Sequence, residues 1–203
     1  INNNGRGELD NEINDLISKP HPFIKNFKVT TMPFNAGVAG GWNMIIKSYM
    51  NSPYWIISNH DVSFENGFLE EMNTAAQDKE TQIVFGNAGD FNLGSFDLFL
   101  IKDTLVQSHG LFDENFYPAY CEDADYIMRL QNNPVKGVYG LNKKYYHGES
   151  FDYYETGSNT RKDDPKLTKK LESVNLQNYE YMTKKWGPGW RQTDPYKHPF
   201  NIE

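Results

Sequence analysis

Asp61 stands at a position where a folded chain can present a ligand for a metal ion. It closely follows the apolar run 54–57, which has the length and composition of a buried strand. The carboxyl ends of strands are where α/β sheets bind ligands, and a carboxylate suits a hard divalent cation such as Mg²⁺ or Mn²⁺. An aspartate that begins a turn explains the same residue equally well. Both interpretations stay open on local sequence alone.

A second group of acids can move a proton. Glu122, Asp123 and Asp125 lie within four residues at the start of a predicted helix over 123–131. Acidic side chains in a first turn stabilise the helix dipole, which accounts for many such clusters. Three carboxylates this close also repel one another, and a nearby cation would offset that repulsion. One of them is then a candidate general base that takes a proton from a hydroxyl group.

A third candidate is His147, which ends a predicted strand over 144–147. A single histidine is most often a surface residue or a hydrogen-bonded core residue. Its place at a strand end, before Gly148, favours a metal ligand. His60 is a weaker candidate, since it stands directly beside Asp61.

The glycine-rich segment 35–43 precedes a predicted helix over 38–50. Backbone N–H groups at a helix start can hold phosphate, and glycine lets a ligand approach closely. The segment has neither the G-x-G-x-x-G spacing nor the lysine of a Walker motif. Tight packing of the helix against a sheet explains its glycines equally well.

These candidates need a framework of alternating strands and helices. Apolar patterning predicts strands over 27–32, 54–57, 82–85, 96–101, 135–139 and 144–147, and helices over 8–18, 38–50, 66–77, 123–131 and 166–186. The alternation predicts an α/β sandwich around a mostly parallel sheet. Ile1 is followed at once by a loop composition, so we expect it to end a strand that begins before this sequence. That suggests one domain of a longer, multidomain protein.

Composition narrows the function classes. The chain has 203 residues and a net charge of −7, which suits one domain and argues against sequence-independent nucleic-acid binding. Its single cysteine, Cys121, excludes an internal disulfide and multi-cysteine metal sites. No apolar run approaches the ~20 residues of a membrane helix. No signal peptide opens the sequence, so we expect a cytoplasmic protein without membrane insertion.

The charge is divided unevenly along the chain. Residues 1–135 carry a net charge of −10, whereas residues 136–203 carry +3. Such a division fits a site that holds a metal ion on carboxylates and an anion on basic side chains. On that ground alone, Arg161, Lys162 and Arg191 are candidates to close over an anion. Uneven surface decoration accounts for the same numbers.

The order of the motifs resembles that of the nucleotide-sugar-dependent glycosyltransferases of family 2 type, which have the GT-A fold. The matching stretches are N-A-G-V-A-G-G-W-N at 35–43, I-I-S-N-H-D-V at 56–62, G-L-F-D-E-N-F at 110–116, E-D-A-D at 122–125 with Arg129, and K-W-G at 185–187 with P-F-N at 199–201. Together they span most of residues 35–201. Each is moderately specific, and their joint order is the stronger signal.

The resemblance implies one GT-A-type domain over 1–203, a Rossmann-like three-layer α/β/α sandwich with a mixed, mostly parallel central sheet. Residues 1–60 would form the nucleotide-binding half, and 61–150 the half that holds the metal, donor and acceptor. Residues 151–203 would form a C-terminal helix and tail. The partners implied are a nucleoside diphosphate sugar, UDP- or dTDP-linked, and a glycan or glycoconjugate hydroxyl, with no nucleic acid.

The resemblance also implies roles for single residues. Asp61 and His147 would hold Mn²⁺ or Mg²⁺, and Asp123 would be the base of an inverting transfer, with Glu122 or Asp125 as the alternative. The implied contacts to the donor are Asn2, Asn4, Arg6, Asn35, Gly37, Asn43, Asn59, His60 and Asp61. Trp42 and the segment 86–90 are weaker candidates for the sugar and acceptor pocket.

Two departures from the family pattern keep other functions open. No D-x-x-S motif, which would contact the base, occurs between Ser18 and Lys28, and Asn59 replaces the first aspartate of D-x-D. Asp61 is thus the sole carboxylate of that motif. The alternatives are an inactive carbohydrate-binding domain on the same scaffold and a metal-dependent phosphoester hydrolase.

Overall fold

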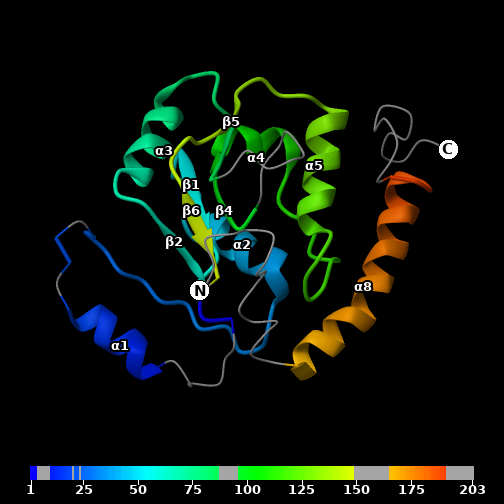
Figure 1. Cartoon of the computed structure of the whole chain (residues 1–203), viewed down its shortest axis with the longest axis horizontal. Helices are drawn as coiled ribbons and strands as arrows, with labels where there is room; N and C mark the ends of the chain where they lie inside the picture. Colours follow the sequence, from blue (N-terminus) through cyan, green and yellow to red (C-terminus); the bar gives the residue numbers. More distant parts are fainter. Residues whose placement is uncertain (4–9, 20, 23, 87–95, 149–164, 191–203) are drawn as a thin grey trace.

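The computed structural model describes residues 1–3, 10–19, 21–22, 24–86, 96–148 and 165–190 (Figure 1). Its strands are β1 (Tyr54–Ser58), β2 (Val62–Phe64), β3 (Ile83–Phe85), β4 (Leu98–Lys102), β5 (Val138–Gly140) and β6 (Tyr145–His147). Its helices are α1 (Asp10–Ser18), α2 (Gly37–Ser48), α3 (Phe68–Gln77), α4 (Asp103–His109), α5 (Glu122–Asn132) and α8 (Pro165–Trp186). None of these helices has the length and apolar character needed to cross a membrane.

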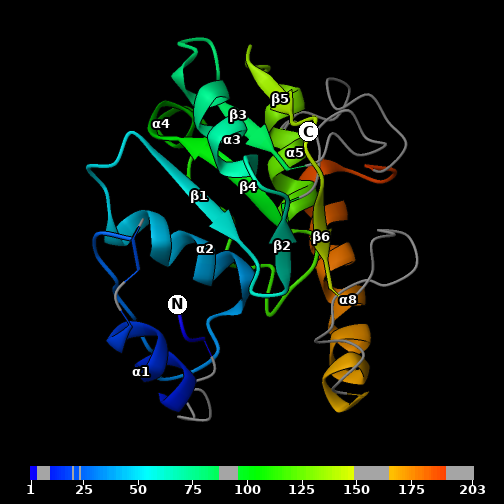
Figure 2. The same ribbon diagram turned by 60° about the vertical axis from the view of Figure 1, so that its left-hand side comes forward.

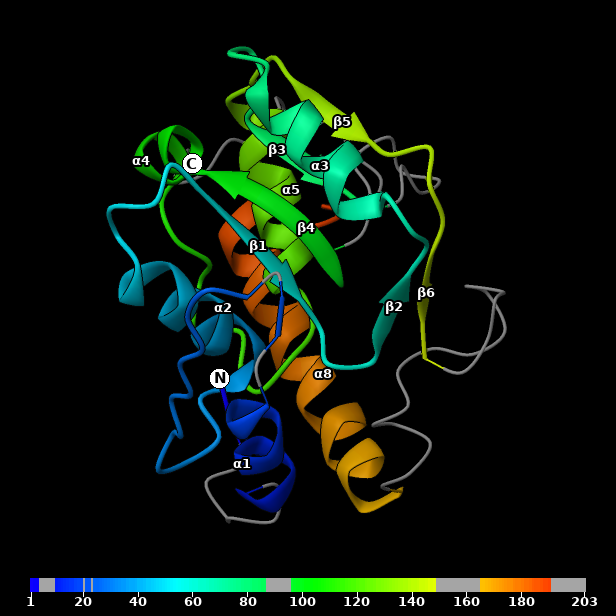
Figure 3. The ribbon, with the colours of Figure 1, turned by 90° about the vertical axis from the view of Figure 1, so that its left-hand side faces the viewer.

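A central sheet with the strand order β1-β4-β3-β5 carries the fold. β4 is antiparallel to both of its neighbours, and only the ladder between β3 and β5 is parallel. The sequence predicted a mostly parallel sheet. In the described sheet most ladders are instead antiparallel, because β4 runs in the opposite direction to the other three strands. A separate antiparallel ladder joins β2 to β6 and stands apart from the central sheet (Figure 3).

Helices cover both faces of the central sheet (Figure 2). Successive side chains of a strand point to opposite faces, and the strand β4 follows this rule closely. Phe99 and Ile101 pack with α2, α4 and α5, whereas Leu98 and Leu100 pack with α3. All four side chains are buried. The central strands are therefore apolar on both faces, which explains why β4 has a continuous apolar run rather than an alternating one.

The long helix α8 packs on the outer side of α5 (Figure 1). Met182 and Trp186 of α8 form an apolar cluster with Phe116, Cys121 and Met128. These five side chains are buried, so this cluster forms a second small core beyond the helices that cover the sheet. The packing attaches α8 to α5 and to the segment that leads into it.

One predicted strand is absent from the described part of the chain. Residues 27–32 form no strand there, and only Thr31 pairs, in a parallel bridge with Asn2. The N–H of Asn2 donates to Thr30 O at 2.8 Å, and the N–H of Met32 donates to Asn2 O at 2.8 Å. An extended segment becomes a strand through its ladder, and among the described residues this one has a single pairing position.

Asp125 lies buried between α5 and α8, with positive or donor groups around it. Its Oδ1 accepts hydrogen bonds from Trp186 Nε1 and Lys185 Nζ, both at 2.8 Å, and its Oδ2 lies 3.2 Å from Arg129 Nε. A general base must reach the substrate, and this carboxylate is enclosed by structural partners. The structure therefore corrects the interpretation of Asp125 as an alternative base.

Replacement of Asp125 by alanine is expected to lower the free energy of unfolding by about 3–5 kcal/mol, since it removes the counter-charge of Arg129 and leaves Lys185 with Asp113 as its remaining carboxylate partner. Urea denaturation measures this loss. Asp125→Asn retains an acceptor for Trp186 Nε1 and is expected to lose less than Asp125→Ala. An alanine variant as stable as the wild type would contradict a structural role for this carboxylate.

Candidate active site

The ends of four strands bring Asp61, Asp97 and His147 together. Asp61 directly precedes β2 and His147 is the last residue of β6, so the short ladder places them side by side. The N–H of Gly148 donates to Asp61 O at 2.7 Å and closes this end of the ladder. Asp97 directly precedes β4, and its backbone oxygen accepts from the N–H of Asn59, the residue after β1, at 2.8 Å.

The imidazole ring of His147 bridges the two carboxylates. Its Nε2 lies 3.2 Å from Asp61 Oδ1, and its Nδ1 lies 3.0 Å from Asp97 Oδ2. The side chains of Asp61, Asp97 and His147 are only 4%, 5% and 14% exposed. The hydrogen bond to Asp97 raises the pKa of His147, and the charges of both carboxylates add to it against the opposing effect of burial. The cluster thus favours a positive charge between two anions.

Asp97 is a site residue that the sequence analysis missed. Its Oδ1 accepts hydrogen bonds from the hydroxyl of Tyr145 at 2.8 Å and from the N–H of Leu98 at 3.1 Å. The only local signal is a carboxylate within the otherwise apolar run 96–101. A buried charge in such a run requires a partner, but the partner lies on a strand distant in sequence.

Asp123 lies in the first turn of α5, close enough to the cluster for the charge of Asp97 to act on its carboxyl group. Its side chain is exposed, yet the protein around it desolvates the carboxylate and thereby raises its pKa. The hydrogen bond from the N–H of Ala124, 2.7 Å long, opposes that rise, and the negative charge of Asp97 adds to it. A solvent-accessible carboxylate with a raised pKa is suited to accept a proton from a substrate hydroxyl.

A strained turn positions the start of α5. Tyr120 and Cys121 have φ of 78° and 76°, a left-handed conformation that non-glycine residues rarely adopt. Such conformations persist where surrounding contacts hold them. Asn178 of α8 supplies two such contacts, since its Nδ2 donates to Ala119 O at 2.8 Å and to Tyr120 O at 3.0 Å. The helix α8 therefore helps to fix the direction in which α5 begins.

Glu122 differs from its neighbour Asp123 in its surroundings. Its side chain is 5% exposed, and within the described residues its Oε2 has no hydrogen-bond partner. Burial, and next the charge of Asp123, raise its pKa to about 8. Glu122 is therefore protonated at neutral pH and is a poor proton acceptor there. Of the three predicted acids, only Asp123 is exposed to solvent.

Asp61 and His147 fit the chemistry of a divalent cation shared with a phosphate ligand. Two ligands at right angles in an octahedral site, each ~2.1 Å from the ion, lie about 3 Å apart. The 3.2 Å between His147 Nε2 and Asp61 Oδ1 is close to that spacing. The described residues contain no group of three or more His, Cys, Asp or Glu arranged to hold a metal ion. Mg²⁺ commonly takes one or two protein ligands and completes its shell with water and substrate phosphate.

Two of the predicted donor contacts, Asn35 and Gly37, lie at the start of α2 together with Asn3, which was not predicted. Asn3 Oδ1 accepts from the N–H of Ala36 at 2.8 Å, and Asn35 Oδ1 accepts from the N–H of Gly37 at 2.8 Å. Gly37 has a φ of 77°, and a Cβ there would lie 2.9 Å from Pro118 O. The predicted residues Asn35 and Gly37 therefore lie beside residues 2–3 and beside the segment that leads to α5.

Two predicted site residues are structural instead. Asn43 is buried, its Nδ2 donates to Phe112 O at 2.8 Å, and its Oδ1 accepts from the N–H of Phe112 at 2.9 Å. Trp42 is buried and packs edge-on against Phe99 and Phe112. The structure therefore does not bring these two side chains to the site. Asn43 connects α2 to the 110–116 segment, and Trp42 packs in the core.

The remaining predicted residues divide into neighbours of Asp61 and residues outside the description. Asn59 is half-buried and His60 is exposed, directly before Asp61. Gly86 is buried at the end of β3. The residues that lie outside the described ranges are Asn4, Arg6, 87–90, Arg161, Lys162, Arg191 and 199–201.

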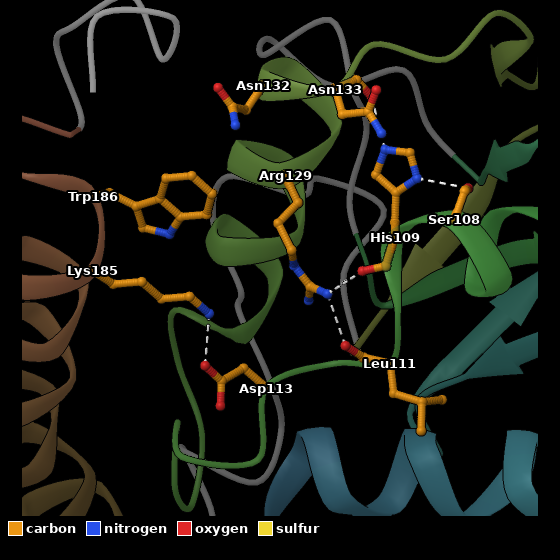
Figure 4. A pocket seen from close by; sticks show the side chains of 9 residues that line it. All are labelled: Ser108, His109, Leu111, Asp113, Arg129, Asn132, Asn133, Lys185 and Trp186. Carbon is orange, nitrogen blue, oxygen red and sulfur yellow. Dashed lines mark hydrogen bonds and ion pairs between the residues drawn. The ribbon is translucent and has the colours of Figure 1, made fainter. Parts of the chain in front are cut away.

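A separate pocket of about 440 Å³ lies among α4, α5 and α8 (Figure 4). It is lined by Ser108, His109, Leu111, Asp113, Arg129, Asn132, Asn133, Lys185 and Trp186. Arg129 Nη1 donates to His109 O at 2.7 Å and to Leu111 O at 2.8 Å, so its guanidinium holds the backbone after α4. The pocket is lined by residues from the C-terminal half of α5, whereas Asp123 lies in the first turn of that helix. The pocket is therefore separate from the candidate site.

Comparison with known proteins gives one partial match. No family model matches the chain. No solved structure matches it either. A protein of Leishmania donovani named galactofuranosyl glycosyltransferase is 30% identical over 115 residues, an alignment that covers 51% of this chain and 26% of the relative. The chain spans about a quarter of the length of that relative. It is therefore similar to part of a glycosyltransferase.

Proposed function

We propose that the protein transfers a sugar from a nucleoside diphosphate sugar to a hydroxyl group of a glycan or glycoconjugate. The observation that carries the proposal is the contact of Asp61 with His147 at the ends of the strands, beside Asp97, whose charge also reaches the carboxyl group of Asp123. The partial match to a glycosyltransferase supports the same class of reaction. The GT-A fold remains part of this proposal, supported by a sheet covered with helices on both faces.

Asp123 is the proposed base. Its carboxylate takes the proton of the acceptor hydroxyl while the acceptor oxygen forms a bond to the anomeric carbon of the donor sugar. The bond between that carbon and the diphosphate breaks at the same time, and the nucleoside diphosphate leaves with the electron pair. Such a displacement inverts the anomeric centre and needs no protein nucleophile.

Asp61 and His147 are the proposed ligands for Mn²⁺ or Mg²⁺. When bound, such an ion neutralises the negative charge that develops on the departing diphosphate. Asp61 contributes a hard oxygen ligand and His147 a nitrogen ligand from the facing strand. The carboxylates otherwise repel a diphosphate, so the ion also makes the acidic site compatible with an anionic donor.

The donor is proposed to be UDP- or dTDP-linked. The name of the partial relative makes a galactofuranose-bearing nucleotide the first donor to test. The cluster of Asn3, Asn35 and Gly37 at the start of α2 is the proposed contact region for the nucleotide, since it offers amide groups beside the segment that leads to Asp123.

Calorimetric titration of UDP, dTDP and GDP, with and without Mn²⁺, tests the proposal. We expect one nucleotide to bind in a Mn²⁺-dependent manner, and Asp61→Ala to weaken that binding at least tenfold. Glu70→Ala is the control, because it removes an exposed carboxylate of α3 that has no part in the site. If no nucleotide binds the wild type, the transferase proposal fails and a sugar-binding scaffold becomes the better interpretation. Release of inorganic phosphate without glycoside would instead indicate a hydrolase.

A further inference from the structure

We propose that Tyr117 and Asn35 form the subsite for the base of the donor nucleotide. The ring of Tyr117 stacks on a pyrimidine base, and the side-chain amide of Asn35 donates a hydrogen bond to a carbonyl oxygen of that base. This inference rests on the proposed function and deepens it, because the proposed metal ligands Asp61 and His147 act on the diphosphate and not on the base. Tyr117 was not among the residues predicted from the sequence.

The ring of Tyr117 is held in place and yet remains uncovered. Its hydroxyl donates to Asn35 O at 3.0 Å, and a Cβ at Gly37 would lie 3.1 Å from Tyr117 Cδ2. Glycine at position 37 therefore lets the ring lie close to the turn that begins α2. Tyr117 is nevertheless 45% exposed, whereas the preceding Phe116 is buried. Because the ring is already ordered, a ligand that stacks on it pays little further conformational entropy.

The amide of Asn35 presents its donor group to the outside of the turn. Its Oδ1 accepts hydrogen bonds from the N–H of Gly37 at 2.8 Å and from Asn3 Nδ2 at 3.2 Å. Both contacts come from N–H donors, so the amide oxygen must occupy this position and Nδ2 lies on the other side of the group. Asn35 is exposed, and among the described residues its Nδ2 has no hydrogen-bond partner. Two N–H donors are therefore open to a ligand.

The same turn offers little to a phosphate group. The backbone N–H groups of residues 36–38 are already taken by Asn3 Oδ1, Asn35 Oδ1 and Pro118 O, each at 2.8 Å. A phosphate at a helix start binds N–H groups that have no other partner. The segments 34–38 and 117–118 also contain no basic side chain. The open groups of this turn thus suit an uncharged part of the donor rather than its diphosphate.

A pyrimidine base matches the groups that remain open. Bases stack on aromatic side chains through their π-faces, and the carbonyl oxygens of uracil and thymine accept hydrogen bonds. Tyr117 offers the aromatic ring and Asn35 the N–H donor. The hydrogen bond from the Tyr117 hydroxyl to Asn35 O keeps the two groups side by side. One flat ligand can therefore contact both.

The first test separates the base from the diphosphate by calorimetric titration. The probes are UDP, dTDP and pyrophosphate, each with Mn²⁺. Tyr117→Leu removes the stacking surface, so we expect its affinity for the nucleotide to fall about 5- to 100-fold and its affinity for pyrophosphate to stay as in the wild type. Tyr49→Leu is the matched control, because Tyr49 is a comparably exposed tyrosine at the other end of α2.

Asn35→Asp tests the donor group of the amide. Aspartate keeps an oxygen that accepts from the N–H of Gly37, and it replaces the N–H₂ group by an oxygen that repels a carbonyl. We expect a loss of nucleotide affinity of at least about fivefold, again with pyrophosphate binding unchanged.

The second test uses the folded wild type and nuclear magnetic resonance. The chain has 13 tyrosines, and in protein deuterated everywhere else, saturation of their ring protons transfers to ligand protons in close contact. We expect transfer to the base protons of the bound nucleotide. Tyr117→Phe keeps a ring but carries no protons in this labelling, so the transfer should disappear. Transfer that is absent in the wild type, or that persists in Tyr117→Phe, would overturn the role of Tyr117.

The outcomes separate the inference from the proposed function. If the wild type binds a nucleotide with Mn²⁺ and Tyr117→Leu and Asn35→Asp bind it equally well, the base subsite is overturned and the transferase stands. An equal loss of nucleotide and pyrophosphate affinity would assign the defect to the diphosphate site and would also overturn the inference. If the wild type binds no nucleotide, both are overturned. Circular dichroism identifies a variant that does not fold, and in that case the wild-type saturation transfer decides.

Discussion

Asp123→Asn is expected to lower kcat by about 10²–10⁴ while the affinity for the nucleotide and for Mn²⁺ stays as in the wild type. Asparagine keeps the size of the side chain and an oxygen that accepts the 2.7 Å hydrogen bond from the N–H of Ala124. It cannot take a proton from a hydroxyl group. The substitution therefore removes the base and leaves the start of α5 intact.

The structure singles out Asp123 among the three predicted acids. Asp125 is buried against Lys185, Trp186 and Arg129, and Glu122 is buried with a pKa raised to about 8. Asp123 alone of the three is exposed, and its carboxyl group senses the negative charge of Asp97. A base must be accessible to the substrate, and of the three acids only Asp123 meets this condition.

The pH dependence of the rate gives a second measure of the same role. Desolvation, together with the charge of Asp97, raises the pKa of Asp123 against its backbone hydrogen bonds. The base works only when ionised, so kcat is expected to fall as the pH drops through this raised pKa. Steady-state kinetics across the acid range measure the fall. In Asp123→Asn the residual kcat should not show this fall at low pH.

Glu122→Gln serves as the control for this prediction. Glu122 is protonated at pH 7, so a neutral glutamine should leave kcat nearly unchanged there. If Asp123→Asn retained the rate of the wild type and Glu122→Gln lost it, the roles of the two residues would be reversed. If both variants retained the kcat of the wild type, neither acid would act as the general base and that step of the proposed mechanism would be wrong.

The long elements of the fold were predictable because their periodicity is local. The predicted helix over 166–186 corresponds to α8 (Pro165–Trp186), and the predicted helix over 66–77 to α3 (Phe68–Gln77). β2 and α4 were missed, since β2 has three residues and exists through its ladder with β6, and α4 has seven residues. Short elements depend on distant partners, which local patterning does not contain.

The same distinction holds for the candidate site. Asp61, Asp123 and His147 were predictable as candidates because each stands at the end or start of a recognisable element. Asp97 was not, because its partner His147 lies fifty positions later and only the meeting of two ladders brings them together. Asn43 was misassigned to the donor for a related reason, since its partner Phe112 lies on another segment.

Glu122 is expected to contribute strongly to the pH dependence of stability. Burial, followed by the charge of Asp123, raises its pKa from the ordinary 4.5 to about 8 in the folded protein. Between these two values the unfolded chain has released the proton and the folded protein still holds it. The folded protein therefore binds more protons in this window, and its stability falls as the pH rises from 4.5 to 8. Above pH 8 the loss is complete.

The magnitude follows from the displacement of the pKa. One pKa unit corresponds to about 1.4 kcal/mol, so this group alone lowers the free energy of unfolding by roughly 3–5 kcal/mol across the window. Glu122→Gln cannot ionise. Its stability relative to the wild type is therefore expected to increase by that amount between pH 4.5 and pH 9. Urea denaturation of both proteins at matched pH values measures the difference.

Glu114→Gln is the control of opposite sign. Hydrogen bonds from Asn43 and then Lys47 lower the pKa of Glu114, so its stabilisation is present above the ordinary value and is lost as the pH falls. The difference between Glu114→Gln and the wild type should therefore change only in acid. If the Glu122→Gln difference also stayed constant from pH 5 to 9, the carboxyl group of Glu122 would be ionised in the folded protein at neutral pH. It would then be a second candidate base beside Asp123, and its burial would not separate the two acids.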